Sequence, residues 1–335
     1  MSESNRGIMG EIRYGVAGSP IRHSLSPLLL SLVCDHLHLS GRSMTLKMEL
    51  VNVASISDAL AWGYAGSVPN PQEWDLTQAV FGTFRTTALM EKAVAAARAV
   101  KIPAAALAPK DEVFVGQVPP RHAQKLPTRM FENEIWMNLT SPLKHQLDSE
   151  AVICIDHSRD IKSINALRWD GKGWWSAGFD GLGICDVMAH HGFHPRDNVL
   201  GLLGGGGAAR STALAWAQNG GTIHLLGGKR ELGEGPWVDS LTSQEPDVVV
   251  NFESGMPVFD ADVVLHASYS NMEGALDERV DRILAMPLDG RWLLVAQHLA
   301  CWKHLWAPER KADLPSLELL LNRLIVAETT LSEYA

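Results

Sequence analysis

A run of glycines followed by an apolar segment is the part of this sequence with the most specific chemical use. Four consecutive glycines, Gly204–Gly207, lie between an apolar stretch and an Ala-rich one. Gly204, Gly206 and Ala209 fit the spacing G-x-G-x-x-G/A, in which small residues allow a tight turn and a close approach to a pyrophosphate. A helix that begins there adds free N–H groups and a positive dipole end. The pattern favours a dinucleotide site, with a phosphate loop for another ligand as the alternative.

Polar residues elsewhere stand at the expected ends of helices and strands. Ser24 and Ser26 precede a predicted helix, where hydroxyls cap the helix or bind a ligand carboxylate. Lys144 follows a predicted strand, and strand ends are where α/β proteins bind ligands. Asp180 opens another predicted helix, and Gln297 lies in an apolar run where a buried amide needs a partner. Taken singly, each residue has a structural explanation as a cap, a solvated charge or a satisfied amide.

Strands and helices alternate in the second half of the chain. We predict strands over 198–203, 222–226, 247–251 and 262–266, with a helix over 208–219 after the glycines. This alternation is typical of a parallel sheet with helices on both faces.

The first half and the C-terminal end are predicted to form a mixed α/β unit. The predicted strands cover 14–17, 44–53, 134–139 and 151–155, with a hairpin over 166–175 and short elements over 56–64 and 76–81. The predicted helices cover 27–38, 87–100, 181–191, 292–304 and 316–331, and residues 117–127 are predicted to be irregular.

Composition limits the class of protein. The chain has 335 residues and a formal net charge of -9, so two domains are expected and nucleic acid or an anionic membrane is not an expected partner. The four cysteines are scattered, which favours a reducing compartment and no metal site. No apolar run is long enough to span a bilayer, and we expect a cytoplasmic location.

Several segments together resemble one family. The matching segments are 18–27 (GSPIRHSLSP), 138–144 (NLTSPLK), 164–167 (INAL), 178–183 (GFDGLG), 204–210 (GGGGAAR) and 289–297 (DGRWLLVAQ). In this combination the chain resembles the shikimate 5-dehydrogenase family, whose members interconvert 3-dehydroshikimate and shikimate. The resemblance covers most of the chain outside residues 41–130.

The resemblance implies a two-domain α/β fold. An N-terminal mixed α/β substrate domain would span residues 1–182, with an insertion at about 41–130. A Rossmann-type doubly wound parallel sheet over 183–289 would bind NADP, and C-terminal helices over 290–335 would return to the substrate domain. The expected partner is a small cyclic hydroxy acid, and the expected state is a monomer or a homodimer.

The resemblance also implies roles for individual residues. Lys144 and Asp180 would form the catalytic pair, with the lysine stabilising charge on the reacting oxygen and moving its proton. Ser24 and Ser26 would hold the substrate carboxylate. The ring hydroxyls would be bound by Thr140, Asn165 and Gln297. The cofactor would be bound by Gly204, Gly205, Gly206, Gly207, Ala208, Lys229 and Arg230.

The choice of cofactor is predicted from the end of the second strand of the dinucleotide unit. NAD sites place an acid there to bind the ribose hydroxyls. Here the strand end has no carboxylate, and Lys229 and Arg230 follow, which favours the 2′-phosphate of NADP. NAD is the alternative.

Three departures from the family pattern leave other functions open. Gly178-Phe179 replaces the family's Asn-Thr before the aspartate, so a bulky ring replaces a hydroxyl close to the reacting centre. Glu253 replaces a threonine, and Leu265 stands at an expected tyrosine. They are expected to lie around the nicotinamide and one side of the substrate. The alternatives are a quinate or aminoshikimate-type dehydrogenase and a non-catalytic nucleotide- or metabolite-binding homologue.

Overall fold

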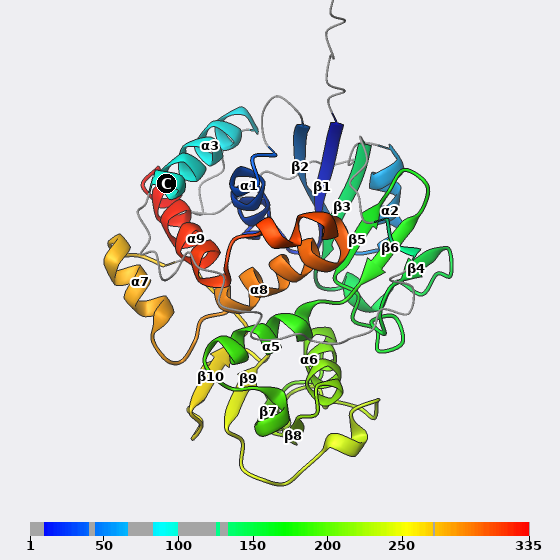
Figure 1. Ribbon diagram of the computed structural model, residues 1–335, viewed down its shortest axis with the longest axis vertical. Helices are drawn as coiled ribbons and strands as arrows, with labels where there is room; N and C mark the ends of the chain where they lie inside the picture. The colour runs from blue at the N-terminus through cyan, green and yellow to red at the C-terminus, as the bar shows by residue number, and fades with distance from the viewer. Residues whose placement is uncertain are drawn as a thin grey trace, which may run out of the picture.

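The computed structural model describes residues 10–39, 44–65, 83–99, 125–127, 133–270 and 272–334. The short element predicted over 76–81 and most of the irregular connection predicted over 117–127 lie outside these residues. Figure 1 shows two sheets in separate halves of the molecule, with α5 and α8 lying between them. The prediction of an α/β protein with a mixed sheet and a parallel sheet is confirmed.

The first sheet combines parallel and antiparallel strands. Its strand order is β2-β1-β3-β5-β6-β4, with β1 parallel to β2 and β3, and β5 antiparallel to its neighbours β3 and β6. The bounds are β1 (Gly10–Gly18), β2 (Met44–Asn52), β3 (Asn133–Leu139), β4 (Val152–Cys154), β5 (Ala166–Trp169) and β6 (Trp174–Ala177).

The predicted hairpin is confirmed as β5 and β6. Asp170 shapes its turn, because Oδ1 accepts hydrogen bonds from the backbone N–H groups of Lys172 and Gly173, each at 2.8 Å. Gly171 has a φ of +87°, a conformation that glycine adopts without the strain of a side chain.

Helices cover both faces of the first sheet. Four pack together on one face: α1 (Ser26–His36), α3 (Thr83–Ala99), α8 (Arg291–Cys301) and α9 (Leu317–Ser332). On the other face lies α2 (Ile56–Ala65), whose Trp62 packs in a separate apolar cluster with Met137. The neighbouring Trp136 belongs to the main core, since successive strand residues point to opposite faces. The predicted helix over 292–304 is confirmed, although its last turn is a π-helix over Trp302–Trp306.

The second sheet is parallel throughout. Its order is β10-β9-β7-β8, and buried valines fill β9 because both of its neighbours and the covering layers exclude water. The bounds are β7 (Val199–Leu203), β8 (Thr222–Leu225), β9 (Val248–Asn251) and β10 (Val263–His266), with α5 (Asp180–His190), α6 (Gly207–Gln218) and α7 (Leu276–Leu284). Helix α7 was not predicted, although its apolar residues 276, 280 and 283 have helical spacing.

Helix α5 joins the two halves because two of its glycines allow close crossings. A Cβ at Gly181 would lie 2.1 Å from the carbonyl oxygen of Ser211 on α6. A Cβ at Gly183 would lie 2.8 Å from the backbone nitrogen of Gln297 on α8. Any larger residue must therefore move a neighbouring helix backbone.

We expect Gly183→Ala to destabilise the protein by about 1–3 kcal/mol, as overpacking does. Alanine in an unobstructed helix would stabilise it instead, by about 1 kcal/mol. Urea unfolding measures the difference, with Gly233→Ala as the control, since a Cβ there meets nothing within 4 Å. An unchanged or raised free energy of unfolding for Gly183→Ala would show that the crossing tolerates a methyl group.

A buried histidine lies beside Gln297 on α8. The imidazole of His298 is 0 % exposed and meets Trp306 edge-on, with ring centroids 5.3 Å apart. Within the described residues neither ring nitrogen has a hydrogen-bond partner. Burial lowers the pKa of His298 to about 3, because the charged form would lose its hydration.

Stability should therefore fall in acid. The pKa of His298 is depressed on folding, so below about pH 6.5 the unfolded state binds more protons than the folded state. The contribution of neutral His298 to the free energy of unfolding is complete above that pH. It is lost at about 1.4 kcal/mol per pH unit as the pH falls toward 3. Urea unfolding between pH 7.5 and 4.5 should show a shallower dependence for His298→Leu than for the wild type. Parallel curves would contradict this.

Candidate functional site

A cavity of about 390 Å³ lies between the two sheets. This volume is in the range that small-molecule sites occupy. Its polar lining comes from both halves of the chain and includes six of the seven predicted catalytic and substrate-binding residues. They are Ser24, Ser26, Thr140, Lys144, Asp180 and Gln297, and the remaining polar lining includes His23, Asn138, Ser268 and Tyr269.

Lys144 and Asp180 form an ion pair at the wall of this cavity. Lys144 Nζ donates to Asp180 Oδ2 at 2.6 Å, and the side chains are 23 % and 5 % exposed. Lys144 lies on a short 3-10 turn after β3, and Asp180 is the first residue of α5 after β6. The pair thus joins two segments that leave the same sheet, with the ammonium as its more accessible member.

Asn165 lies behind this pair and not on the cavity wall. Its Nδ2 donates to Asp180 Oδ1 at 2.9 Å and to Gln297 Oε1 at 2.7 Å, and its Oδ1 accepts from the backbone N–H of Phe179 at 2.9 Å. The side chain is 1 % exposed. The role of Asn165 in binding a ligand hydroxyl stays a prediction, and in this structure its amide donors orient Asp180 and Gln297.

The strand that leads to Lys144 is fixed by a buried tyrosine. Tyr14 on β1 donates its hydroxyl to Asn138 Oδ1 at 2.5 Å. Burial raises the pKa of Tyr14 well above its ordinary value, so the phenol stays protonated and remains a donor. Thr140 is the first residue after β3, and its backbone N–H donates to Ala17 O on β1 at 2.9 Å. These bonds hold the end of β3 beside β1.

The glycine turn opens beside the same cavity. Gly204 has a φ of +111°, and its N–H donates to Gly227 O at 2.8 Å. Gly206 precedes the first residue of α6 without a side-chain cap, and a Cβ there would meet nothing within 4 Å. Ala208 on α6 lines the cavity, and a Cβ at Gly207 would lie 3.5 Å from Lys144 Cβ. The helix N-terminus can therefore receive an anion next to Lys144.

The other predicted cofactor residues lie beside this turn. Gly205 packs against the loop after β8, where a Cβ would lie 2.1 Å from Glu231 O. Lys229 Nζ donates to Ser254 Oγ at 3.1 Å. Arg230 is exposed. The pKa of Arg210 on α6 is lowered mainly by the burial of Arg210 and, to a lesser extent, by the like charge of Arg230. The structure thus brings the two predicted cations to the same edge of the sheet as the glycines.

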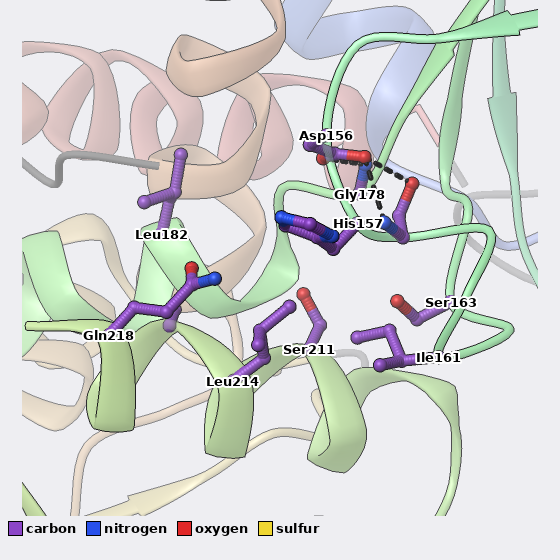
Figure 2. A pocket seen from close by; sticks show the side chains of 11 residues that line it. Asp156, His157, Ile161, Ser163, Gly178, Leu182, Ser211, Leu214 and Gln218 are labelled. Atoms are coloured by element: carbon purple, nitrogen blue, oxygen red, sulfur yellow. Dashed lines mark hydrogen bonds between the residues drawn. The ribbon is translucent and has the colours of Figure 1, made fainter. Parts of the chain in front are cut away.

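The residues before Asp180 depart from the family pattern for reasons of packing. A Cβ at Gly178 would lie 2.6 Å from Ser158 Cβ, and the N–H of Gly178 donates to Asp156 Oδ2 at 2.9 Å. Figure 2 shows this contact at a second cavity of about 20 Å³, which has room for about one water molecule. A glycine therefore fits at position 178, where the segment that carries Ser158 lies against the backbone, whereas a side chain there would collide with Ser158.

The expectation that Phe179 places a bulky ring at the reacting centre is wrong. Its side chain is 3 % exposed and is not part of the cavity lining. The ring lies against His304, with centroids 6.0 Å apart and planes 28° apart. The substitution therefore alters the packing behind the site.

Tyr269 is a lining residue that the sequence analysis missed. Leu265, at the position of the expected tyrosine, is 0 % exposed within β10. Tyr269 follows that strand, lines the cavity, and its hydroxyl accepts from Leu25 N at 3.4 Å. Burial raises its pKa to about 12, so the hydroxyl is protonated at neutral pH. Its place after a parallel strand was the available signal.

Among the described residues, no group of three or more His, Cys, Asp or Glu side chains is placed to hold a metal ion. None of the helices in the described part of the chain combines the length and apolar character needed to cross a bilayer.

We expect Asn165→Asp to lower the free energy of unfolding by about 3 kcal/mol or more, because it sets a second buried carboxylate against Asp180 and removes two donors. Urea unfolding measures this, with Asn52→Asp at the exposed end of β2 as the matched control. Equal effects of the two substitutions would show that the Asn165 network contributes nothing.

Similar sequences and similar solved structures both include shikimate dehydrogenases. No family model matches the chain. The shikimate dehydrogenase (NADP+) of Natronomonas pharaonis is 26% identical over 211 residues, which cover 56% of this chain and 78% of that protein. Two further curated matches of the same name span 30% of the relatives' length.

Two solved structures share the fold over nearly the whole chain. An Ael1 enzyme from Pseudomonas putida has a TM-score of 0.55 at 19% identity, covering 93% of this chain and 97% of that one. Shikimate 5-dehydrogenase from Thermus thermophilus, solved with shikimate, has a TM-score of 0.54 at 15% identity, covering 95% and 99%. The matching motifs, the curated sequence relatives and the shared fold therefore agree: this chain is similar to shikimate dehydrogenases in both sequence and fold.

Proposed function

We propose that this protein is an oxidoreductase that interconverts 3-dehydroshikimate and shikimate with NADP(H). The observation that supports this most directly is the position of Lys144. Its ammonium is paired with Asp180 at the cavity wall. The Cβ of Lys144 lies 3.5 Å from the position that a Cβ at Gly207, in the glycine turn, would take. A proton donor is thus placed between a cavity of substrate size and a turn suited to a dinucleotide.

The substrate would be oriented by groups on opposite sides of the cavity. Ser24 and Ser26, at the start of α1, supply hydroxyls for its carboxylate. Thr140 and Gln297 supply groups for its ring hydroxyls, and Gln297 offers its Nε2 donors because Oε1 already accepts from Asn165. Asn165 would act through Asp180 and Gln297 as a positioning residue.

The proton would be moved by the Lys144–Asp180 pair. Bound NADP(H) supplies the hydride. As the ring carbonyl is reduced, Lys144 Nζ donates a proton to its oxygen, and in the reverse direction the uncharged amine accepts it. Asp180 holds the ammonium at 2.6 Å and is itself fixed by Asn165.

The cofactor fit rests on the turn and on the cations beside it. The uncapped N-terminus of α6 and the open face of Gly206 would receive the pyrophosphate. Lys229 and Arg230 would favour the 2′-phosphate. The name of the curated relative, shikimate dehydrogenase (NADP+), supports the same cofactor.

The domain division is part of this proposal. Residues 1–182, with the insertion at about 41–130, would form the substrate domain, and residues 183–289 would bind the cofactor. The packing of α8 and α9 against α1 and α3 supports the return of residues 290–335 to the substrate domain. The buried ring of Phe179 removes one argument for a quinate-type substrate or a loss of turnover.

We expect Lys144→Met to lower kcat for NADP+-dependent oxidation of shikimate by about 10²–10⁴-fold, because the general base is lost. The absorbance of NADPH measures the rate. Lys172→Met, in the exposed hairpin turn, should leave it unchanged. Retention of most of the activity in Lys144→Met would remove the lysine from the mechanism. A wild-type protein that turns over neither shikimate nor quinate, but binds both tightly, would contradict the proposed enzyme.

A further inference from the structure

A carboxylate from a neighbouring strand lies where the end of β8 lacks one. Glu253 follows β9, yet its Oε1 accepts from the backbone N–H of Lys229, after β8, at 3.1 Å. A Cβ at Gly228 would lie 3.0 Å from the same oxygen, and a Cβ at Gly204 would lie 3.5 Å from it. The loops that follow β7, β8 and β9 thus converge on the Glu253 carboxylate.

The geometry leaves part of this carboxylate available. Glu253 is only partly buried, and in the described part of the chain no hydrogen bond reaches its Oε2. Its backbone N–H donates to Asn251 Oδ1 at 2.8 Å, which fixes the loop from which the side chain extends. A carboxylate anchored by one oxygen presents the other in a defined position.

This position has a chemical meaning in a parallel dinucleotide fold. An acid beside the first glycine of the turn and the end of the second strand accepts hydrogen bonds from the ribose hydroxyls of NAD. The loop after β8 supplies no such acid before Lys229, and between β8 and β9 the chain forms only a 3-10 turn, η4 (Val238–Ser240). Glu253 places the same functional group there from the other side of β7.

The positive charge of the neighbouring Lys229 favours the other coenzyme. Lys229 Nζ is bonded to Ser254 Oγ at 3.1 Å, so this ammonium lies beside the Glu253 loop. A ribose hydroxyl would meet the carboxylate favourably, whereas a 2′-phosphate would meet it as a like charge and Lys229 as an opposite one.

We infer that Glu253 sets the coenzyme choice of this protein: its carboxylate binds the adenosine ribose hydroxyls of NAD(H), so the site accepts NAD(H) as well as NADP(H). The inference rests on the dinucleotide site of the proposed function. It differs from that proposal in assigning the discrimination to a residue after β9.

The test is direct binding of each coenzyme, measured by calorimetry without substrate. We expect the wild type to bind NAD+ and NADP+ with dissociation constants within about tenfold of each other. Glu253→Gln should weaken NAD+ binding about tenfold or more, and leave NADP+ binding unchanged or tighter, because hydrogen bonds to a charged acceptor are the stronger ones. The Gln side-chain oxygen still accepts from Lys229, so the turn is preserved.

Glu245→Gln is the matched control. It makes the same change of charge on an exposed residue before β9, at the opposite edge of the parallel sheet. It should leave both dissociation constants unchanged.

The outcomes separate the two proposals. If Glu253→Gln changes neither affinity, or both equally, the inference is overturned while the proposed function stands. If the wild type binds NADP+ but not NAD+, the inference also fails. If the wild type binds neither coenzyme, the proposed function fails, and the inference fails with it.

Discussion

The site depends on how the Asp180 carboxylate is held. One oxygen accepts from Lys144 at 2.6 Å and the other from Asn165 at 2.9 Å. Each donor comes from a different segment of the first sheet, and Asn165 also holds Gln297 at 2.7 Å. A carboxylate that is 5 % exposed stays charged at low cost only when such partners compensate its lost hydration. The ion pair therefore requires the strands that deliver its partners to keep their register.

Helix α5 makes this arrangement compatible with a second sheet. Asp180 begins the helix, and Gly181 and Gly183 allow α6 and α8 to approach its backbone closely. Because α6 begins at the glycine turn and α8 carries Gln297, the crossings bring Ala208 of α6 and Gln297 of α8 to one cavity. The D-G-x-G pattern is thus a packing requirement as well as a resemblance.

The departures from the family pattern divide into two kinds. Gly178 and Phe179 are explained by packing, since one accommodates Ser158 and the other lies against His304 outside the cavity. Glu253 is different, because its carboxylate stays partly exposed beside the glycine turn. With a coenzyme bound at that turn as proposed, a charged group beside it would act on the ligand directly, whereas a ring that faces the core acts only through packing.

The sequence by itself determined the alternation of strands and helices, the glycine turn and the hairpin at Asp170, because these depend on local periodicity and turn chemistry. The resemblance to a known family, and not local pattern, indicated Lys144 and Asp180 as a pair. Only the tertiary structure decided that Asn165 serves behind that pair, that Tyr269 lines the cavity and that Glu253 reaches the end of β8. These are contacts between residues far apart in the chain, and local pattern carries no information on which side chains meet when two sheets and their loops converge.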